Sequence, residues 1–294
     1  MFKDFLSFLV LIDQPINQVN TTTLLSFMEF MVQSNFSHAN IANHVSGLRA
    51  SYILHGLSTD IFKDERIPLF LKSLQINAPF SPTVRVTISV DMLMDIIRVC
   101  DKLRHPVLFK ALYVFCFFSF LRLSNILPHA IRQYDVTRHL ARGDVIITSD
   151  KCSVIIKWSK TNQKRKDYHT ISLPCLGKSP ICPLAAMTRM YKAYPASKND
   201  PLFLVWSANR LQTLTDSVAR KHLKKVCLLL DIKPSLTFHS FRRSGTTWAF
   251  HKGVPLEHIM SHGLWSSEAV WRYIQSQPSS SSRVSAAFQH HLQL

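Results

Sequence analysis

Apolar side chains recur at helical spacing through residues 1–75. In the segment SHANIANHVSGLRASYILHG, Ile41, Val45, Leu48 and Tyr52 follow one another at three- and four-residue intervals, and Ser37 before them is a good N-cap. The segments FKDFLSFLVLI, NTTTLLSFMEFMVQS and ERIPLFLKSLQ have a similar pattern. Because this pattern gives each helix one apolar face to bury, residues 1–75 are predicted to form an all-helical unit.

A short segment, NAPFSPT (77–83), interrupts the helical pattern. It contains two prolines and, apart from Phe80, no long apolar side chain. Proline cannot donate a backbone hydrogen bond and breaks a helix, so the segment is predicted to be a linker. We therefore expect two domains, residues 1–80 and residues 83–294.

Residues 83–294 combine helical patterns with a few short strands. The apolar run 107–121 contains Lys110 and is shorter than the roughly 20 residues of a membrane span, so it predicts a buried helix. β-Branched segments at 144–149, 152–158 and 168–174 predict a small antiparallel sheet with a basic hairpin loop. Further helices are expected at 89–100, 183–194, 214–231 and 239–252. The predicted fold is mainly α with a small antiparallel β-sheet.

Charge is distributed unevenly between the two predicted domains. The chain has a formal net charge of +17. Residues 1–80 hold five Lys or Arg and six Asp or Glu, a net charge of −1, so residues 81–294 carry +18. A balance this basic indicates a polyanionic partner, with nucleic acid first and an anionic membrane surface second. No predicted helix concentrates positive charge beside an apolar face, which disfavours the membrane.

Six cysteines lie in the second domain, and no two of them form a CxxC pair. This spacing favours buried free thiols in a reducing compartment over disulfides or a zinc site. The N-terminus lacks the succession of basic, apolar and small residues that marks a secretory signal. We expect a protein that is not secreted, located in the nucleus if the host is eukaryotic and otherwise in the cytoplasm.

Four groups of residues could act on a phosphate. His239 and Arg242 in HSFRRSG are three residues apart and share a helix face, where a guanidinium can grip two oxygens and an imidazole can move a proton. Arg122 ends the apolar run, Lys160 lies at the mouth of the basic hairpin, and Tyr273 lies near the end of GLWSSEAVWRYI. Taken singly, each has a plainer explanation: a solvated helix face, a snorkelling arginine, a solvated lysine and a core tyrosine.

Taken together, the order and spacing of these residues resemble the tyrosine recombinases, the phage-integrase family. FLRLSN resembles that family's first arginine box, SKTNQKRK its β-hairpin, and HSFRRSG and GLWSSEAVWRYI its last two boxes. The resemblance covers nearly the whole chain, and its wording is closest to recombinases of eukaryotic mobile elements of the DIRS and Crypton kind. It implies the two-domain DNA breaking-rejoining architecture: a helical core-binding (SAM-like) DNA-binding domain in residues 1–80, then a catalytic domain with a C-terminal tail helix in residues 83–294.

The resemblance implies a site-specific recombinase or integrase that cuts and rejoins double-stranded DNA. Tyr273 would attack a phosphodiester to give a 3′-phosphotyrosyl intermediate, and Arg122 and Arg242 would neutralise the charge of the phosphorane. Lys160 would protonate the leaving 5′-oxygen, and His239 would accept the tyrosine proton or position the phosphate. No cofactor, metal or ATP is implied. The 12 acidic residues of the second domain form no obvious triad of the kind that holds two metal ions.

Two positions depart from the family's pattern. The residue three after the first arginine is usually acidic and is Asn125 here. Most members place a histidine nine residues before the tyrosine, directly after a glycine; here Gly263 is in register, but Leu264 follows it. The sixth catalytic position could be taken by Trp265, whose indole N–H can donate to a phosphate oxygen, or by His262. We favour Trp265, with a purely structural role as its alternative.

Phosphate contacts are expected from basic residues of the second domain, and such contacts position DNA without reading its sequence. The net charge of −1 on residues 1–80 departs from the basic surface expected of a domain that clamps DNA. Either Arg49, Lys63, Arg66 and Lys72 cluster to supply such a surface, or the second domain carries most of the binding. The expected contacts are Lys164, Arg165, Lys166, Arg210, Arg220, Lys221, Lys224, Lys225 and Arg243.

A rival explanation is a domesticated, non-catalytic DNA-binding protein descended from a mobile-element recombinase, since a fold can outlive its activity. The presence of all five central residues argues for the enzyme. A type IB topoisomerase shares the chemistry, but the helical first domain and the SKT wording favour a recombinase.

The segment VSAAFQHHL, which follows the Ser-rich stretch after Tyr273, has the pattern of a short amphipathic helix. In the family that it resembles, such a C-terminal helix often docks on a neighbouring protomer, so we expect a dimer or tetramer on DNA. Truncation at Gln277 should abolish synapsis of two DNA duplexes, measured by gel-shift, while leaving the monomer folded. A truncated chain that still synapses would contradict this.

Overall fold

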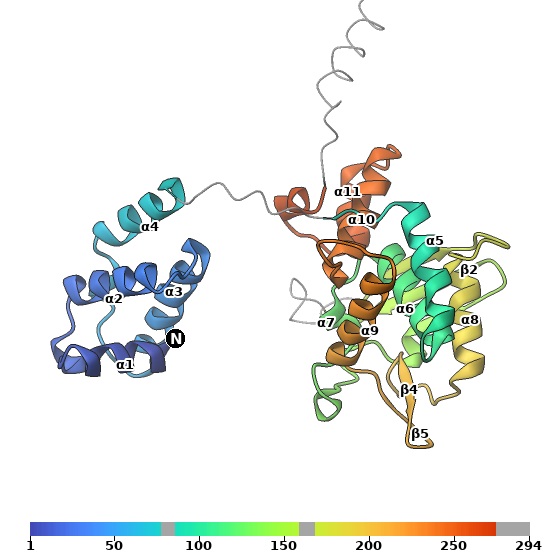
Figure 1. Cartoon of the computed structure of the whole chain (residues 1–294), viewed down its shortest axis with the longest axis horizontal. Coiled ribbons are helices and arrows are strands. Elements are labelled where there is room, and N and C mark those ends of the chain that lie inside the picture. Colours follow the sequence, from blue (N-terminus) through green and yellow to red (C-terminus); the bar gives the residue numbers. More distant parts are fainter. Residues whose placement is uncertain (78–85, 159–167, 275–294) are drawn as a thin grey trace, which may run out of the picture. The chain divides into compact units, whose positions relative to one another are not determined.

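The computed structural model describes residues 1–77, 86–158 and 168–274, drawn in colour in Figure 1. The chain divides into two compact units, Met1–Thr83 and Val84–Leu294. The division falls at the proline-containing segment that interrupts the helical pattern. Each unit has an apolar core of its own.

Unit 1, residues 1–77 of the described chain, consists of helices packed around one apolar core (Figure 1). Asn20 begins the second helix by accepting a hydrogen bond of 3.0 Å from the backbone of Thr23, and Ser37 caps the third. The helices are α1 (Phe2–Leu11), α2 (Thr21–Gln33), α3 (His38–Leu54) and α4 (Arg66–Asn77). Their buried faces contribute Phe5, Leu24, Phe27, Met28, Ile41 and Leu48.

Unit 2 is mainly helical and contains two small antiparallel sheets. Its helices are α5 (Val90–Val99), α6 (Pro106–Ser119), α7 (Leu123–Ile126), α8 (Pro183–Ala193), α9 (Asp216–Leu229), α10 (Phe238–His251) and α11 (Leu256–Gly263). Its strands are β1 (Val145–Ile147), β2 (Lys151–Ile156), β3 (His169–Pro174), β4 (Leu204–Ser207) and β5 (Arg210–Thr213).

Helix α6 is the centre of unit 2. It is the apolar run of the sequence, most of its residues are buried, and it packs against α5, α8 and α10. Pro106 at its first turn and the left-handed Phe120 (φ 53°) after its last turn set its ends. Gly245 lets α10 approach that C-terminal end, because a Cβ there would overlap the carbonyl oxygen of Phe117. Arg122 lies three residues after the end of α6, close enough to the start of α10 for its charge to affect His239 and Arg242.

The first sheet has the order β1-β2-β3, with Val154 of β2 paired to Val145 on one side and Ile171 on the other. Along β2, Cys152, Val154 and Ile156 are buried while their neighbours are not, which is the alternation of a strand with one face on the core. This is the sheet predicted from the sequence.

The second sheet, β4–β5, was not predicted from the sequence. Ser207 pairs with Arg210, so Ala208 and Asn209 form a two-residue turn in which both residues have positive φ (47° and 58°). Two-residue turns with positive φ usually contain a glycine, which makes them recognisable in a sequence, and this turn contains none.

Within the described residues, no helix is long and apolar enough to cross a membrane, and no group of His, Cys, Asp or Glu side chains is placed to hold a metal ion. All six cysteines are free, and five of them are buried.

His222 on α9 is a buried histidine that joins two elements of the core. Its ring stacks on Phe109 with centroids 3.5 Å apart, and its Nδ1 shares a 2.7 Å hydrogen bond with the Tyr113 hydroxyl. Burial, with a further contribution from the charge of Lys225, lowers the pKa of His222 from 6.5 to about 4. The ring is therefore neutral at pH 7.

This depressed pKa couples stability to pH. Below pH 6.5 the unfolded chain gains a proton at His222 that the folded chain does not accept until about pH 4, so stability is full above pH 6.5 and falls with pH. When the pH is lowered from 7 to about 4.5, the unfolding free energy of wild type should fall further than that of His222→Gln, by about 2 kcal/mol. Urea denaturation at the two pH values measures both falls. Equal losses in the two proteins would contradict the assignment.

Candidate active site

The start of α10 places His239 and Arg242 one turn apart on the same side of the helix. The backbone N–H of Thr237 donates to Ser240 Oγ (3.1 Å), which fixes the first turn. Beneath it, Phe241 is fully buried and stacks on Tyr113 at 5.3 Å between ring centroids. These contacts anchor the start of α10 on the core.

Arg242 is the most deeply buried charge of the site, with only 1% of its surface exposed. Its guanidinium donates to the backbone carbonyls of Phe120 and of Gly263, the latter at 2.8 Å. It lies 3.7 Å from the centroid of the Trp265 ring and 5.1 Å from that of Tyr273. Arg242 thus ties together the end of α6, the end of α11 and the segment that carries Tyr273.

No carboxylate of the described chain lies within ion-pair distance of Arg242. Burial lowers its pKa to about 9, the nearby charge of Arg122 adds to the shift, and Tyr273 opposes it. The group is still protonated at pH 7. The site therefore holds a buried cation whose nearest charged neighbour is another cation, which is an arrangement that an anion would stabilise.

Arg142 provides a comparison within the same unit. It too is buried (4% exposed), donates to a backbone carbonyl, that of Tyr194, and lies over an aromatic ring, that of Tyr191. However, Tyr191 and then Asp200 oppose the lowering of its pKa by burial, and no neighbouring cation adds to that lowering. Burial of an arginine is therefore not by itself a functional signal, whereas the excess positive charge around Arg242 is.

Trp265 is held by the turn that ends α11. Leu264 adopts a left-handed conformation (φ 58°), and Trp265 N–H donates back to Met260 O at 2.9 Å. The indole packs directly on Gly263, where any Cβ would overlap it. Its ring meets Tyr273 edge to face at 5.2 Å, and its buried Nε1 has no hydrogen-bond partner among the described residues.

Of the residues considered for the sixth catalytic position, Trp265 lies against both Arg242 and Tyr273. The His262 Nε2 instead shares a hydrogen bond of 2.9 Å with the Phe118 carbonyl, and its ring packs against Phe120. Burial lowers the pKa of His262, so this ring is neutral.

Tyr273 follows a single 3₁₀ turn, Glu268–Arg272, and is half-buried. Thr247 of α10 donates its hydroxyl to the Tyr273 carbonyl at 2.9 Å, which fixes the backbone of this residue. The ring centroids of Tyr273 and His239 are 6.2 Å apart. Burial, followed by the charges of Arg242 and Arg243, lowers the pKa of His239, so its imidazole is neutral and able to accept a proton at pH 7.

Arg122 and Asn125 lie at the two ends of α7. Arg122 is half-buried, and its charge contributes to the lowered pKa of both His239 and Arg242, so it belongs to the same cluster. Asn125 is 3% exposed and donates its amide N–H to the Trp158 carbonyl at 3.1 Å. An ionised carboxylate could not make this bond, which gives a physical reason for the amide at a position that is usually acidic in the resembled family.

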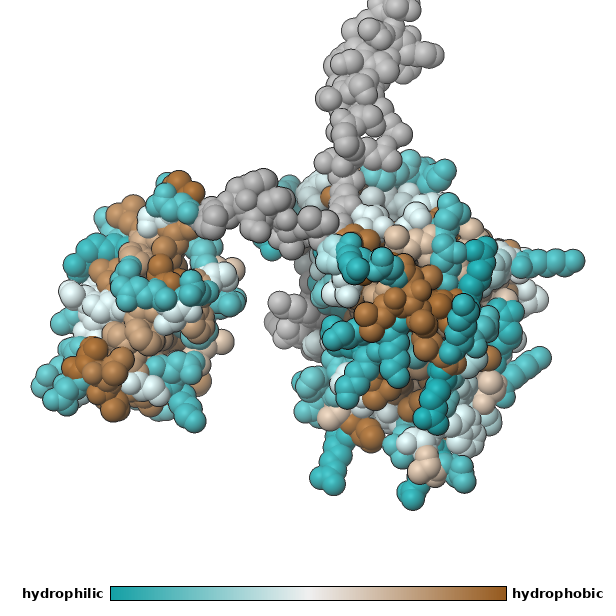
Figure 2. All heavy atoms as spheres, in the orientation of Figure 1, coloured by the Kyte–Doolittle hydropathy of each residue, from teal (hydrophilic) through white to brown (hydrophobic). Residues whose placement is uncertain are grey.

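The predicted DNA-contact residues lie on several elements. Arg220, Lys221, Lys224 and Lys225 are exposed on α9, Arg210 is exposed at the start of β5, and Arg243 is half-buried on α10. Figure 2 shows long hydrophilic side chains projecting from the drawn face of unit 2. Four predicted residues lie outside the described residues: Lys160, Lys164, Arg165 and Lys166.

The sequence did not indicate every group of the site. The Phe120 and Gly263 carbonyls that hold Arg242 are backbone atoms and leave no trace in residue type. Thr247, which fixes Tyr273, lies five residues after Arg242 and so not on the same face of α10, and its spacing gave no signal.

No protein-family model matches the chain, and no curated protein matches it. Solved structures do match. The chain is similar to the Tn1549 transposon integrase in complex with transposon right end DNA, with 14% identity, a TM-score of 0.64, and coverage of 94% of this chain and 87% of that one.

Two further structures agree with this likeness. The XerH site-specific recombinase bound to its difH substrate has 13% identity and a TM-score of 0.53, with 98% of this chain and 76% of that one covered. The lambda integrase dimer bound to a COC′ core site has 12% identity and a TM-score of 0.57, with 92% of this chain and 70% of that one covered. Identities this low establish the fold alone. The predicted fold class is confirmed: the chain has the mainly helical, small-sheet fold of the tyrosine recombinases.

Proposed function

We propose that the protein is a site-specific DNA recombinase that cuts and rejoins double-stranded DNA through a 3′-phosphotyrosyl intermediate. The observation that carries the proposal is the placement of the Tyr273 ring beside the buried Arg242, which has no carboxylate partner in the described chain. A nucleophile and an unbalanced cation share one small site, and a phosphodiester would satisfy both. The DNA complexes of the similar Tn1549 integrase and XerH support this choice of substrate.

Each step of the proposed reaction is carried out by residues of unit 2. The Tyr273 oxygen attacks phosphorus while the neutral His239 accepts its proton, and the bond from phosphorus to the 5′-oxygen breaks. Arg122 and Arg242 stabilise the charge of the phosphorane. Lys160, which lies outside the described residues, delivers a proton to the leaving 5′-oxygen. The phosphotyrosyl bond conserves the phosphodiester energy, so a 5′-hydroxyl can reverse the step without ATP or a cofactor.

Trp265 has two roles in this scheme. Its ring covers one face of the Arg242 guanidinium and excludes water from it, which strengthens the interaction of the cation with phosphate. Its buried Nε1–H has no partner among the described residues, and in this scheme it donates to a phosphate oxygen when DNA is bound.

The finer features of the proposal come from the sequence. Residues 1–80 would form the core-binding domain, the segment after Tyr273 would join protomers into a dimer or tetramer, and the origin would be a mobile element of the DIRS or Crypton kind. The protein would act in the nucleus of a eukaryotic host and otherwise in the cytoplasm. The second candidate, a non-catalytic DNA-binding descendant, is disfavoured by a candidate site in which every described member of the predicted set is clustered.

A covalent-capture experiment with randomised DNA tests the proposal and selects a target sequence at the same time. A library of randomised duplexes, each with a nick that lets the cut fragment diffuse away, is incubated with the protein, and protein-linked DNA is recovered after denaturation. Wild type should yield adducts that converge on one sequence over successive rounds. Tyr273→Phe should yield none, because phenylalanine lacks the attacking oxygen. Failure of wild type to form any adduct would leave the non-catalytic candidate.

The two roles of Trp265 are separable with the selected substrate. Trp265→Phe keeps a ring over Arg242 but lacks the N–H, so we expect the rate of adduct formation to fall about tenfold with little loss of stability. Trp265→Ala should lose both rate and stability, since it also exposes the guanidinium to water. Single-turnover kinetics and thermal denaturation measure the two effects. A Trp265→Phe rate equal to that of wild type would remove the N–H from the mechanism.

A further inference from the structure

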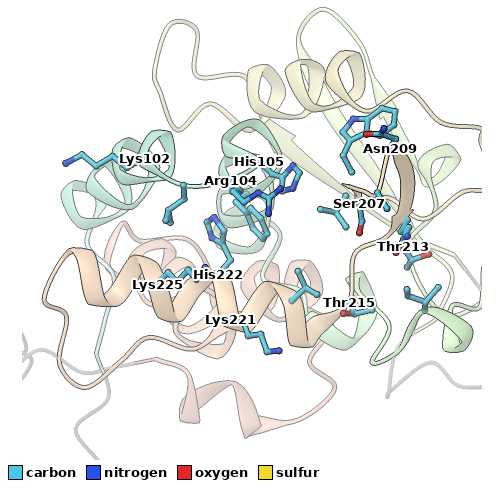
Figure 3. A pocket seen from close by; sticks show the side chains of 18 residues that line it. Lys102, Arg104, His105, Ser207, Asn209, Thr213, Thr215, Lys221, His222 and Lys225 are labelled. Carbon is cyan, nitrogen blue, oxygen red and sulfur yellow. The ribbon is translucent and has the colours of Figure 1, made fainter.

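A second cationic site lies on unit 2, between α9, the β4–β5 hairpin and the turn that precedes α6 (Figure 3). It is a groove of about 840 Å³, a volume within the range of roughly 300–1,000 Å³ that is typical of ligand sites. We call it the basic groove and define it by Lys102, Arg104, His105, Trp206, Lys221 and Lys225.

The charge of the basic groove is uncompensated. Its described lining contains no Asp or Glu. The adjacent Lys110 is paired with Asp101 at 2.7 Å, so acids are present nearby but are directed elsewhere. Within the described chain, no ion pair involves any of the four strong cations of the groove: Lys102, Arg104, Lys221 and Lys225. Such a concave basic surface attracts phosphates.

The floor of the basic groove is aromatic and uncharged. It is formed by the stacked rings of His222 and Phe109, and Figure 3 shows His222 between the cationic side chains of α9 and the turn before α6. His105 beside it also has a lowered pKa, caused by burial and by the charge of Arg104. The groove thus combines cationic side chains with an uncharged aromatic floor.

Trp206 adds an exposed aromatic face to the wall of the groove. It lies on β4, paired with Leu211 of β5, and is 42% exposed. The two-residue turn at Ala208 and Asn209 joins β4 to β5. A large exposed aromatic ring on a strand is a platform on which a planar base can stack.

Helix α9 separates the basic groove from the candidate active site. Arg220 lies close enough to His239 for its charge to lower the pKa of that residue, whereas Lys221 and Lys225, one turn apart, line the groove. The two sites therefore lie on different faces of one helix.

We propose that the basic groove binds single-stranded DNA, with one base stacked on Trp206 and the adjoining phosphates held by Lys221, Lys225 and Arg104. A duplex could place phosphates on the lysines, but its bases are stacked inside and would leave Trp206 unused. A single strand uses both features. The inference rests on the proposed function in one respect, the choice of DNA as the polyanion.

Equilibrium binding to a fluorescent oligothymidylate, followed by anisotropy, tests the proposal. All variants are made in the Tyr273→Phe chain, so that no covalent capture contributes. Trp206→Ala should weaken oligothymidylate binding about tenfold, while Trp206→Phe, which keeps a stacking ring, should stay within about threefold of the parent. Lys221→Gln/Lys225→Gln should flatten the dependence of log affinity on log salt by about 1.4 units, because two phosphate contacts to a single strand are lost.

The matched control is Trp248→Ala, which removes a tryptophan of similar exposure (44%) that does not line the groove. It should leave oligothymidylate affinity unchanged. Binding to a random-sequence duplex should be the same in Trp206→Ala and its parent. The proposal is overturned if Trp206→Ala binds oligothymidylate as tightly as its parent, or if it loses duplex affinity by the same factor, because the groove would then serve the duplex backbone.

Failure of this inference and failure of the proposed function give different results. With Tyr273 restored, Trp206→Ala should form the covalent adduct at the wild-type rate, because the groove does not touch the reacting groups. If the protein forms no adduct but its strand binding depends on Trp206, the assignment of Tyr273 as nucleophile is refuted, and the single-strand role of the basic groove is supported. Adduct formation together with strand binding that does not depend on Trp206 would support the Tyr273 nucleophile and refute the single-strand role of the basic groove.

Discussion

The burial of the Arg242 guanidinium is the constraint on which the rest of the site depends. A buried charge without a counter-ion costs several kcal/mol unless fixed dipoles and aromatic faces surround it. Here the Phe120 and Gly263 carbonyls and the rings of Trp265 and Tyr273 provide that environment. These groups come from the end of α6, the end of α11 and the segment after it, so one side chain fixes the positions of three separate parts of unit 2.

The same positive charge sets the chemistry available at the site. Together with burial, the cations Arg242, Arg243 and Arg122 lower the pKa of His239, and the resulting neutral imidazole can take a proton that an imidazolium could not. A free tyrosine phenol, with a pKa near 10, requires such a base at neutral pH. The excess positive charge also favours the binding of an anionic phosphodiester over that of a neutral substrate.

Much of this arrangement could be predicted from the sequence, and the remainder could not for identifiable reasons. The helices of unit 1 and strand β2 were found because apolar spacing directly reports a buried face. The β4–β5 hairpin escaped because its turn uses Ala208 and Asn209 where glycine is the usual signal. The residue set was indicated by spacing, but the contact of Trp265 with Arg242 depends on the left-handed Leu264, a conformation that leucine seldom adopts and that sequence does not announce.

In the proposed reaction, one particular oxygen of this chain, that of the Tyr273 side chain, becomes bonded to DNA. Nuclease digestion of the purified adduct, followed by proteolysis and tandem mass spectrometry, would locate the residue that retains the nucleotide remnant. We expect a single modified peptide, with the remnant on Tyr273 and attached through a 3′-phosphate. A remnant on another residue, or one attached through a 5′-phosphate, would contradict it.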